Sequence, residues 1–288
     1  MAFSSLGIIM NKKTSKTTNK QASSSLTPRS VVITKQQLLI LTRIYNFRFV
    51  STAQLQQLLA KKQLQQVQQR LNLLLKRGYI GRNFSNQDRL TGRYASYYLL
   101  PKGMKVLRQH QIKLDVKLNS KVLHNIYKDK TASTRFINHC LGVGDINCHL
   151  KRLYGEDIEF ISKSKLADYD FLPNPLPDAF IRQDKTQEYF LEYCEEIVPF
   201  FVYRKRIKQY VEVYIEEGAW KDATGTELPT IRLVAETPVL QRRLKRFITK
   251  YLNNLYMGTG ARFLITNLER LKTSDSQFIW SVIIQEEE

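Results

Sequence analysis

The spacing of the apolar residues changes once along this chain of 288 residues, near residue 130. Before that point, apolar residues recur at the spacing of helices that bury one stripe. After it, short apolar runs alternate with helical segments, which is the pattern of a domain that packs helices on a sheet. With 43% hydrophobic residues, the chain can bury a core for each pattern. The sequence therefore predicts a multi-domain α/β protein.

Four consecutive parts are expected along the chain. Residues 1–32 are rich in Lys, Ser, Thr and Asn and are expected to form a disordered basic arm, which either aids solubility or contacts phosphates. Residues 33–112 form the first domain, and residues 113–130 form a polar linker. Residues 131–288 form the second domain, for which we expect a helix over about residues 131–154 and strands at 158–162, 178–182 and 189–193. A helix and a further strand follow, and this order is typical of an α/β domain with a mixed sheet.

The first domain is expected to begin with three helices. Thr34 can cap the first helix and Ser51 or Thr52 the second, because their hydroxyl groups accept hydrogen bonds from the free amides of a helix start. The third helix covers about residues 62–77, and Gly78 ends it in the left-handed conformation that glycine adopts easily.

A hairpin and a closing helix are expected next. Tyr79 and Ile80 pair with residues 94–100 across a long polar tip, and Pro101 starts the last helix. Three helices, a two-stranded wing and a closing helix are the element order of a winged helix-turn-helix domain.

The net charge of +19 is concentrated in the first third of the chain. Residues 1–110 contain 19 Lys and Arg and one acidic residue, Asp88, whereas the rest of the chain contains 26 basic and 25 acidic residues. A charge excess confined to one domain is typical of a module that binds a polyanion. A membrane surface would instead favour an amphipathic helix with an aromatic face, and none is evident. Double-stranded DNA is therefore the expected partner.

The third helix is expected to present a face that reads DNA. At about 100° per residue, the side of the core receives Leu64, Val67, Leu71 and Leu74. The opposite side carries Lys62, Gln65, Gln66, Gln69 and Arg70. In the major groove, Gln can pair with adenine and Arg with guanine. Glutamines alone would favour a solvated helix face, but such a face normally mixes both signs of charge, and this one has no carboxylate.

The tip of the hairpin carries three arginines, which are Arg82, Arg89 and Arg93. A wing commonly lies along the DNA backbone or in the minor groove, and arginine suits both places. We expect these arginines to contact phosphates rather than bases.

Two segments of the second domain carry acidic residues that suit metal chemistry. Asp178 in LPDAFIRQD starts one expected strand, and Glu192 in QEYFLEYCEE lies in the next. On neighbouring strands of a hairpin, two carboxylates that face the same side could share a divalent cation such as Mg²⁺. Such a metal can generate hydroxide and stabilise a scissile phosphate. Taken singly, Asp178 also suits a turn or cap after Pro177, and Glu192 also suits a surface position on a strand.

The spacing and element order of these segments resemble the restriction-endonuclease-like fold, whose motif is Pro-Asp followed by Asp/Glu-x-Lys. Asp178 and Glu192 match its two acidic positions, which implies catalytic and metal-binding roles for them. Cys194 stands at the position of the lysine, and this departure favours a domain that does not cleave DNA. The alternative is that Lys205 or Lys208 on the following helix supplies the ammonium group. In that case Mg²⁺ or Mn²⁺ would be the cofactor.

Three short motifs resemble those of the replication-relaxation family of plasmids and integrative elements. They are YYLLPKG at 97–103, LPDAF followed by YFLEY in the second domain, and RKRIKQY at 204–210. The resemblance covers about residues 33–270. It implies a role in plasmid replication, relaxation of supercoiled DNA or mobilisation, beside a relaxase or a replication initiator.

These expectations lead to one function and two alternatives. The first is a sequence-specific duplex DNA-binding accessory protein of a mobile element, for which a homodimer is left open. The alternatives are a metal-dependent endonuclease or nickase that uses Asp178 and Glu192, and a winged-helix transcription regulator. Three cysteines without a CxxC pair, and no sequence segment long and apolar enough to span a bilayer, favour a reduced, cytoplasmic protein.

Overall fold

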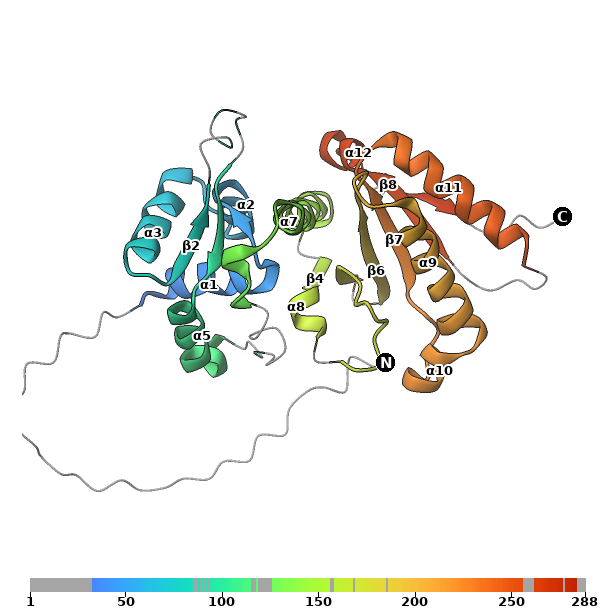
Figure 1. The fold of residues 1–288 in the computed structure, drawn as a ribbon, viewed down its shortest axis with the longest axis horizontal. Helices are drawn as coiled ribbons and strands as arrows, with labels where there is room; N and C mark the ends of the chain where they lie inside the picture. The colour runs from blue at the N-terminus through green and yellow to red at the C-terminus, as the bar shows by residue number, and fades with distance from the viewer. Residues whose placement is uncertain are drawn as a thin grey trace, which may run out of the picture.

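The computed structural model contains a small sheet and a large sheet, each with helices packed on it (Figure 1). It describes residues 33–84, 88, 90, 92, 94–114, 118, 126–155, 158–167, 169–184, 186–255, 262–276 and 278–283. The expected basic arm, residues 1–32, lies outside the described residues, as do Arg89 and Arg93 of the expected wing. No helix within the described ranges is long and apolar enough to cross a membrane.

The first part of the chain folds into helices around a three-stranded antiparallel sheet. The helices are α1 (Lys35–Phe47), α2 (Thr52–Leu58), α3 (Leu64–Lys76) and α5 (Pro101–Leu114). The strands are β1 (Val50–Ser51), β2 (Ile80–Asn83) and β3 (Ser96–Leu99), in the order β1-β3-β2. The helices and the β2–β3 hairpin follow one another as the sequence predicted, and β1 is a third strand of the same sheet.

Local signals in the sequence set the ends of these helices. Thr34 caps α1 and Ser51 caps α2, and in each case a Gln three residues later completes a capping box. Gly78 follows α3 with a φ of +69°, so the expected left-handed turn is confirmed.

The buried stripe of α3 is shorter than expected. Val67, Leu71 and Leu74 are buried, whereas Leu64 is 46% exposed. Leu64 is the first residue of α3 and lies at the solvent end of the stripe. The expectation that it faces the core is therefore wrong.

The second part of the chain contains a six-stranded mixed sheet in the order β4-β5-β6-β7-β8-β9. Its strands are β4 (Ile158–Ser162), β5 (Ala179–Gln183), β6 (Gln187–Cys194), β7 (Thr230–Ala235), β8 (Phe263–Asn267) and β9 (Ser281–Ile283). β4, β5 and β6 form an antiparallel meander, β6, β7 and β8 are parallel, and β9 is antiparallel to β8. The mixed α/β class expected from the sequence is confirmed.

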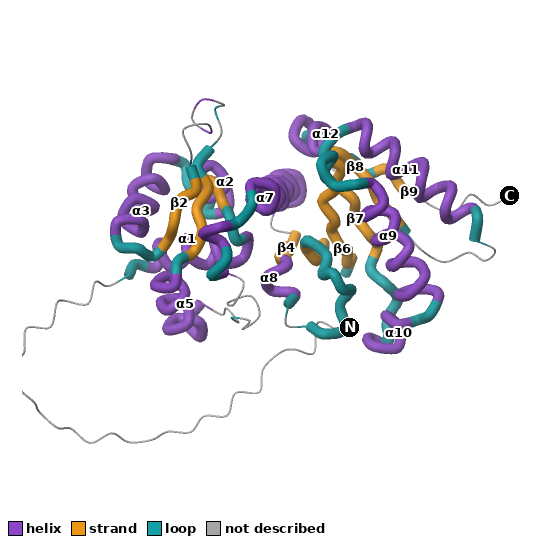
Figure 2. Tube along the Cα trace, in the orientation of Figure 1, coloured by secondary structure: helices purple, strands orange, loops and turns teal. Residues whose placement is uncertain are grey.

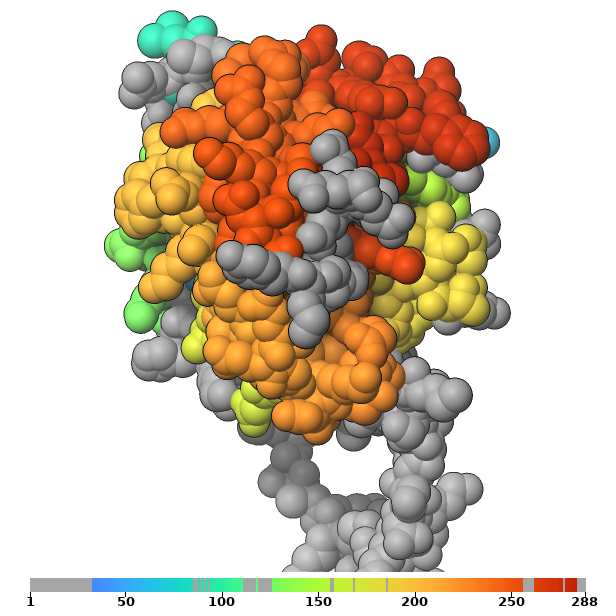
Figure 3. Space-filling view, turned by 90° about the vertical axis from the view of Figure 1, so that its right-hand side faces the viewer, coloured from blue at the N-terminus to red at the C-terminus, as the bar shows by residue number. Residues whose placement is uncertain are grey.

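Helices cover both faces of the large sheet. On one face, α7 (Thr134–Tyr154) lies between the large sheet and the small sheet (Figure 1). The other face is covered by α9 (Phe200–Val211), a π-helical turn (Glu212–Glu216), α10 (Ala219–Thr224) and α11 (Pro238–Asn253). In Figure 3, the segments coloured orange include these helices and cover that side of the molecule. The short helices α8 (Lys163–Leu166) and α12 (Leu268–Thr273) follow β4 and β8.

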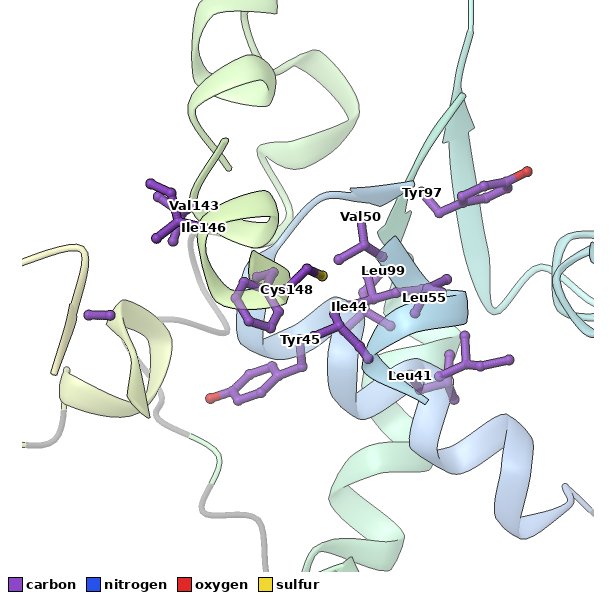
Figure 4. Packing of buried hydrophobic residues seen from close by; sticks show 14 of the residues in the cluster. Leu41, Ile44, Tyr45, Val50, Leu55, Tyr97, Leu99, Val143, Ile146 and Cys148 are labelled. Atoms are coloured by element: carbon purple, nitrogen blue, oxygen red, sulfur yellow. The ribbon is translucent and has the colours of Figure 1, made fainter. Parts of the chain in front are cut away.

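Helix α7 connects the two parts through a continuous core. Ile44 of α1 and Val143 of α7 belong to the same buried cluster (Figure 4), which continues onto the large sheet. The side-chain amide of Gln54 on α2 donates hydrogen bonds of 2.7 Å to the Leu141 carbonyl and to the Asp145 carboxylate. The first part therefore packs directly on α7.

The end of the expected linker, residues 113–130, is also packed. Ile126 and Asp129 are buried, and Arg48 forms an ion pair with Asp129. Burial raises the pKa of Asp129, which the guanidinium of Arg48 opposes. Helix α7 starts at Thr134 rather than at residue 131 as expected, because Asp129–Thr131 form a 3₁₀ turn that this ion pair holds.

Candidate functional site

The expected reading face of α3 is open to solvent. Lys62, Gln65, Gln66 and Gln69 are exposed, and Arg70 is half-buried. α3 itself contains no acidic residue. Figure 2 shows α3 on the far side of the small sheet from α7, so the large sheet and its helices do not cover it.

Side chains on neighbouring elements position α3. The hydroxyl of Thr52 on α2 donates to Gln68 Oε1 at 3.3 Å, and Gln68 Nε2 donates to Asn72 Oδ1 at 3.3 Å. Arg70 Nη1 donates to the carbonyl oxygen of Gln66 at 3.1 Å. The guanidinium of Arg70 therefore lies along the helix.

Only one of the three expected wing arginines can be placed. Arg82 lies on β2, is exposed, and has its guanidinium 5.6 Å from the centre of the Phe84 ring. Arg89 and Arg93 are outside the described residues. Arg82 is on the strand that leads into the hairpin tip, so it is available to a ligand bound beside β2.

A cavity of about 1250 Å³ opens between α7 and α9, at one end of the β5–β6 hairpin. Asp178 and Glu192 both line it. Ala179 pairs with Leu191, so Asp178 and Glu192 are the next residues outward at the same end of the hairpin. The fold thus brings together the two acidic residues that the sequence selected.

Asp178 is buried and its carboxylate is held by three donors. Its Oδ1 accepts hydrogen bonds from His139 Nε2 at 3.0 Å and from Lys163 Nζ at 3.4 Å. Its Oδ2 accepts one from the backbone N–H of Tyr193 at 2.9 Å. Burial alone would raise the pKa of Asp178, but His139, Lys163 and this N–H hold it below its usual range. Asp178 is a fixed carboxylate.

Glu192 has a separate set of partners on α9. Its Oε1 accepts hydrogen bonds from Arg206 Nε at 2.8 Å and from the Tyr210 hydroxyl at 2.5 Å. Burial and the neighbouring Glu192 raise the pKa of Tyr210 well above its usual value. Burial lowers the pKa of Arg206, but Glu192 outweighs this effect and raises it. The phenol therefore stays protonated, and Glu192 is paired with a half-buried cation.

His139 of α7 connects Asp178 to a further carboxylate. Its Nδ1 lies 2.7 Å from Glu195 Oε2, and its ring stacks on Tyr193 with 5.6 Å between the ring centres. Burial would lower the pKa of His139, but Asp178 and Glu195 raise it to about 10. The imidazole is therefore a cation at neutral pH.

A comparison with known protein families decides where this chain belongs. The replication-relaxation family matches residues 41–228, which include both α3 and the residues that line the cavity. This chain belongs to the replication-relaxation family. The resemblance seen in the sequence is thus confirmed, and membership supports a role in plasmid or mobile-element replication or relaxation. No curated protein and no solved structure gives a significant match.

In this replication-relaxation protein, the two acidic residues do not fit a shared divalent cation. Mg²⁺ and Mn²⁺ need free carboxylate oxygens. Both oxygens of Asp178 instead accept hydrogen bonds, from His139, Lys163 and the N–H of Tyr193. Oε1 of Glu192 accepts hydrogen bonds from Arg206 and Tyr210. Among the described residues, no group of three or more His, Cys, Asp or Glu side chains could hold a metal ion.

The residues considered in place of the usual lysine lie in different surroundings. Cys194 is buried in the core on the α9 side of the sheet, and burial raises the pKa of its thiol. Lys205 and Lys208 line the cavity. The ammonium group bound to Asp178, however, belongs to Lys163 at the start of α8.

The sequence selected Asp178 and Glu192 but missed the residues that bind them. His139, Lys163 and Arg206 come from α7, α8 and α9, which are far apart in the sequence. Their spacing carries no motif. The one available signal is the RKRIKQY segment, which contains both Arg206 and Tyr210.

Proposed function

We propose that this protein is a sequence-specific duplex DNA-binding accessory factor in the replication, relaxation or mobilisation of a plasmid or mobile element. The observation that carries the proposal is the exposed face of α3, which has no acidic residue. The surrounding domain adds a charge excess, because residues 1–110 contain 19 basic residues and one acidic residue. Positive charge provides affinity for phosphates, and amide side chains provide contacts with base edges.

We infer that the first domain is a winged helix, and this fold suits the proposed binding of DNA. α2 and α3 would be the helix-turn-helix, with β2 and β3 as the wing. As the recognition helix, α3 would enter the major groove, where Gln65 and Gln69 are one turn apart and reach neighbouring bases. Arg70 would release the Gln66 carbonyl to contact guanine. Lys62 and Arg82 would contact phosphates.

We infer that the second domain is restriction-endonuclease-like, and the succession of α7, the β4–β6 meander, α9 and β7 supports this inference. We assign it a holding role, for DNA or for a partner protein such as a relaxase or a replication initiator. We assign it no cleavage, because the carboxylates of Asp178 and Glu192 are already bound by cationic side chains.

Binding measurements with two duplexes test the proposal. Fluorescence anisotropy would compare a duplex from the element's own origin with a scrambled duplex of equal length. We expect the double variant Gln65→Ala/Gln69→Ala to lose about 10-fold or more in preference for the origin duplex, since a good base contact is worth about 1–3 kcal/mol. Gln187→Ala, an exposed glutamine on β6, is the matched control. Unchanged preference in the double variant would overturn the assignment of α3.

A metal-dependent endonuclease or nickase is the second candidate, favoured by the position of Asp178 and Glu192 at one end of one cavity. Supercoiled plasmid incubated with the protein and Mg²⁺ or Mn²⁺ separates the two functions. We expect no nicked product with either metal. Nicking that disappears in Asp178→Ala would establish the enzyme instead.

A transcription regulator is the third candidate, since winged helices also serve regulators. Mapping the sites that the protein occupies on its host DNA distinguishes the two roles. We expect occupancy at the origin region of the element. Occupancy confined to promoters would favour the regulator.

A further inference from the structure

Three cations line the cavity and are exposed. They are Arg135 on α7 and Arg204 and Lys205 on α9, and they form no ion pair within the described ranges. The guanidinium of Arg204 lies 5.4 Å from the centre of the Phe247 ring. These side chains are therefore available to an anionic ligand.

The acidic residues of the cavity are already neutralised. Asp178 and Glu195 share His139, Glu192 is paired with Arg206, and Glu212 forms an ion pair of 3.5 Å with Lys208. Lys163, half-exposed, supplies the second positive charge that Asp178 and Glu195 need. Since the acids are paired and Arg135, Arg204 and Lys205 are not, the field in the cavity favours phosphate groups.

Apolar side chains stand exposed beside these cations. Phe201, in the first turn of α9, is 66% exposed and lines the cavity together with Val202, which is 41% exposed. The ring of Phe136 on α7 lines the same cavity. An exposed aromatic ring next to unpaired cations is the combination that binds single-stranded nucleic acid, because a free base stacks on the ring while the cations contact the backbone.

We propose that this cavity binds single-stranded DNA, with a base stacked on Phe201 and with Arg204 and Lys205 on the phosphates. A base stacked within a duplex cannot lie on this ring, which favours a single strand over a duplex. The inference rests on the proposed function only in assuming that the protein acts on DNA.

The cavity and the α3 face form two separate surfaces. Figure 1 shows α3 and α9 on opposite sides of α7 along the longest axis of the molecule. A short duplex on the outer face of α3 therefore does not reach the cavity of the same protomer. The two surfaces can be tested independently.

Anisotropy with a labelled oligothymidylate of about 15 nucleotides and with the origin duplex tests the inference. We expect Phe201→Ala to weaken binding of the single strand about 5- to 10-fold, since stacking one base on an aromatic ring is worth about 1–3 kcal/mol. Arg204→Ala/Lys205→Ala should weaken it about 10-fold or more and reduce its salt dependence. Binding of the duplex should not change in either variant.

Matched variants elsewhere control for general effects. Phe278→Ala removes another exposed aromatic ring, and Lys272→Ala removes an exposed lysine of α12, so both should bind the oligothymidylate as the wild type does. If Phe201→Ala and Arg204→Ala/Lys205→Ala bind the oligothymidylate as tightly as the wild type does, the inference is overturned. A preference of the wild-type protein for oligouridylate over oligothymidylate would also overturn it. A protein that binds the single strand but not the duplex would instead refute the proposed function alone.

Discussion

His139 shows how one side chain fixes the chemistry of the cavity. It is positioned between Asp178 and Glu195 and lies within hydrogen-bond distance of both. As a cation, it helps Lys163 and the N–H of Tyr193 to hold the buried carboxylate of Asp178. We infer that the site holds its carboxylates for structure, and that the exposed cations around them meet the ligand.

Removal of His139 should therefore destabilise the protein. In His139→Gln, Asp178 keeps Lys163 and the N–H of Tyr193 but loses its strongest cationic partner. We expect a loss of about 1–3 kcal/mol in the free energy of unfolding at neutral pH, measured by urea denaturation. His149→Gln, a histidine elsewhere on α7, is the control. An unaltered midpoint in His139→Gln would refute the role given to His139.

The wild type and His139→Gln should also differ in how their stability depends on pH. The pKa of His139 is raised from 6.5 to about 10, so the folded state holds this proton more tightly than the unfolded state does. The resulting stabilisation is complete below about pH 6.5 and is lost as the pH rises to about 10. We expect the stability difference between wild type and His139→Gln to shrink across this window. A difference that stays constant up to pH 10 would contradict the shift.

Arg232 on β7 tests how much a buried charge costs the fold. Its side chain is 3% exposed, its Nη2 donates to Gln183, and its Nε and Nη1 have no hydrogen-bond partner within the described residues. The guanidinium lies 3.4 Å from the centre of the Tyr189 ring, and burial lowers its pKa. An apolar side chain of similar length avoids the cost of this buried charge. We expect the free energy of unfolding of Arg232→Met, measured by thermal denaturation, to lie within about 1 kcal/mol of the wild-type value or above it. A loss of about 3 kcal/mol or more would contradict this expectation.

At the scale of elements, strands with short apolar runs were the most predictable. The sequence placed β4 at residues 158–162, where the structure has it, and placed β5 one residue early. Helix ends with capping residues were also predictable, because Thr34 and Ser51 act through bonds within four residues. Local rules determine these features, so a single sequence contains them.

Features that depend on distant contacts were not predictable. The start of α7 is displaced by a turn that holds Asp129 against Arg48, 81 positions earlier in the chain. The same holds for the site, where Asp178 and Glu192 followed from a strand motif, but His139 and Lys163 did not. Their contacts form only when α7 and α8 pack around the end of the hairpin.

The packing of α7 on β6 depends on a glycine. A Cβ at position 142 would lie 2.3 Å from Cε1 of Tyr193, the ring that also stacks on His139. At Gly144, a Cβ would lie 3.1 Å from Gln54 Nε2, the end of a flexible side chain. We expect Gly142→Ala to lower the free energy of unfolding by about 1–3 kcal/mol. Gly144→Ala should lower it less, because the Gln54 side chain can move aside and alanine favours a helix over glycine by up to about 1 kcal/mol. A larger loss in Gly144→Ala than in Gly142→Ala would contradict this packing.

At the scale of the whole molecule, the charge is divided between the two parts of the chain. The positive excess belongs to the first 110 residues, and the second part is close to neutral. We therefore assign the affinity for duplex DNA to the first domain. The cations of the cavity provide a smaller, local electrostatic field. Because α7 packs between the two sheets, the two surfaces that we propose to bind DNA keep a fixed relation to each other.

Salt dependence measures the contribution of single charges to this affinity. We expect the logarithm of the duplex binding constant to fall linearly with the logarithm of the salt concentration. Lys62→Ala should reduce that slope by about 1, because one phosphate contact is lost. The exposed Lys272 on α12 is remote from α3, and Lys272→Ala should leave the slope unchanged. Equal slopes for Lys62→Ala and the wild type would remove Lys62 from the interface.

A footprint on the origin region of the element's own DNA tests whether α3 reads DNA. We expect a protected duplex site with the wild-type protein and with Phe201→Ala, because both retain the α3 face. The protection should disappear in Gln65→Ala/Gln69→Ala/Arg70→Ala. Protection that persists in this triple variant, or no protected site with the wild type, would contradict the assignment of α3 as the element that reads DNA.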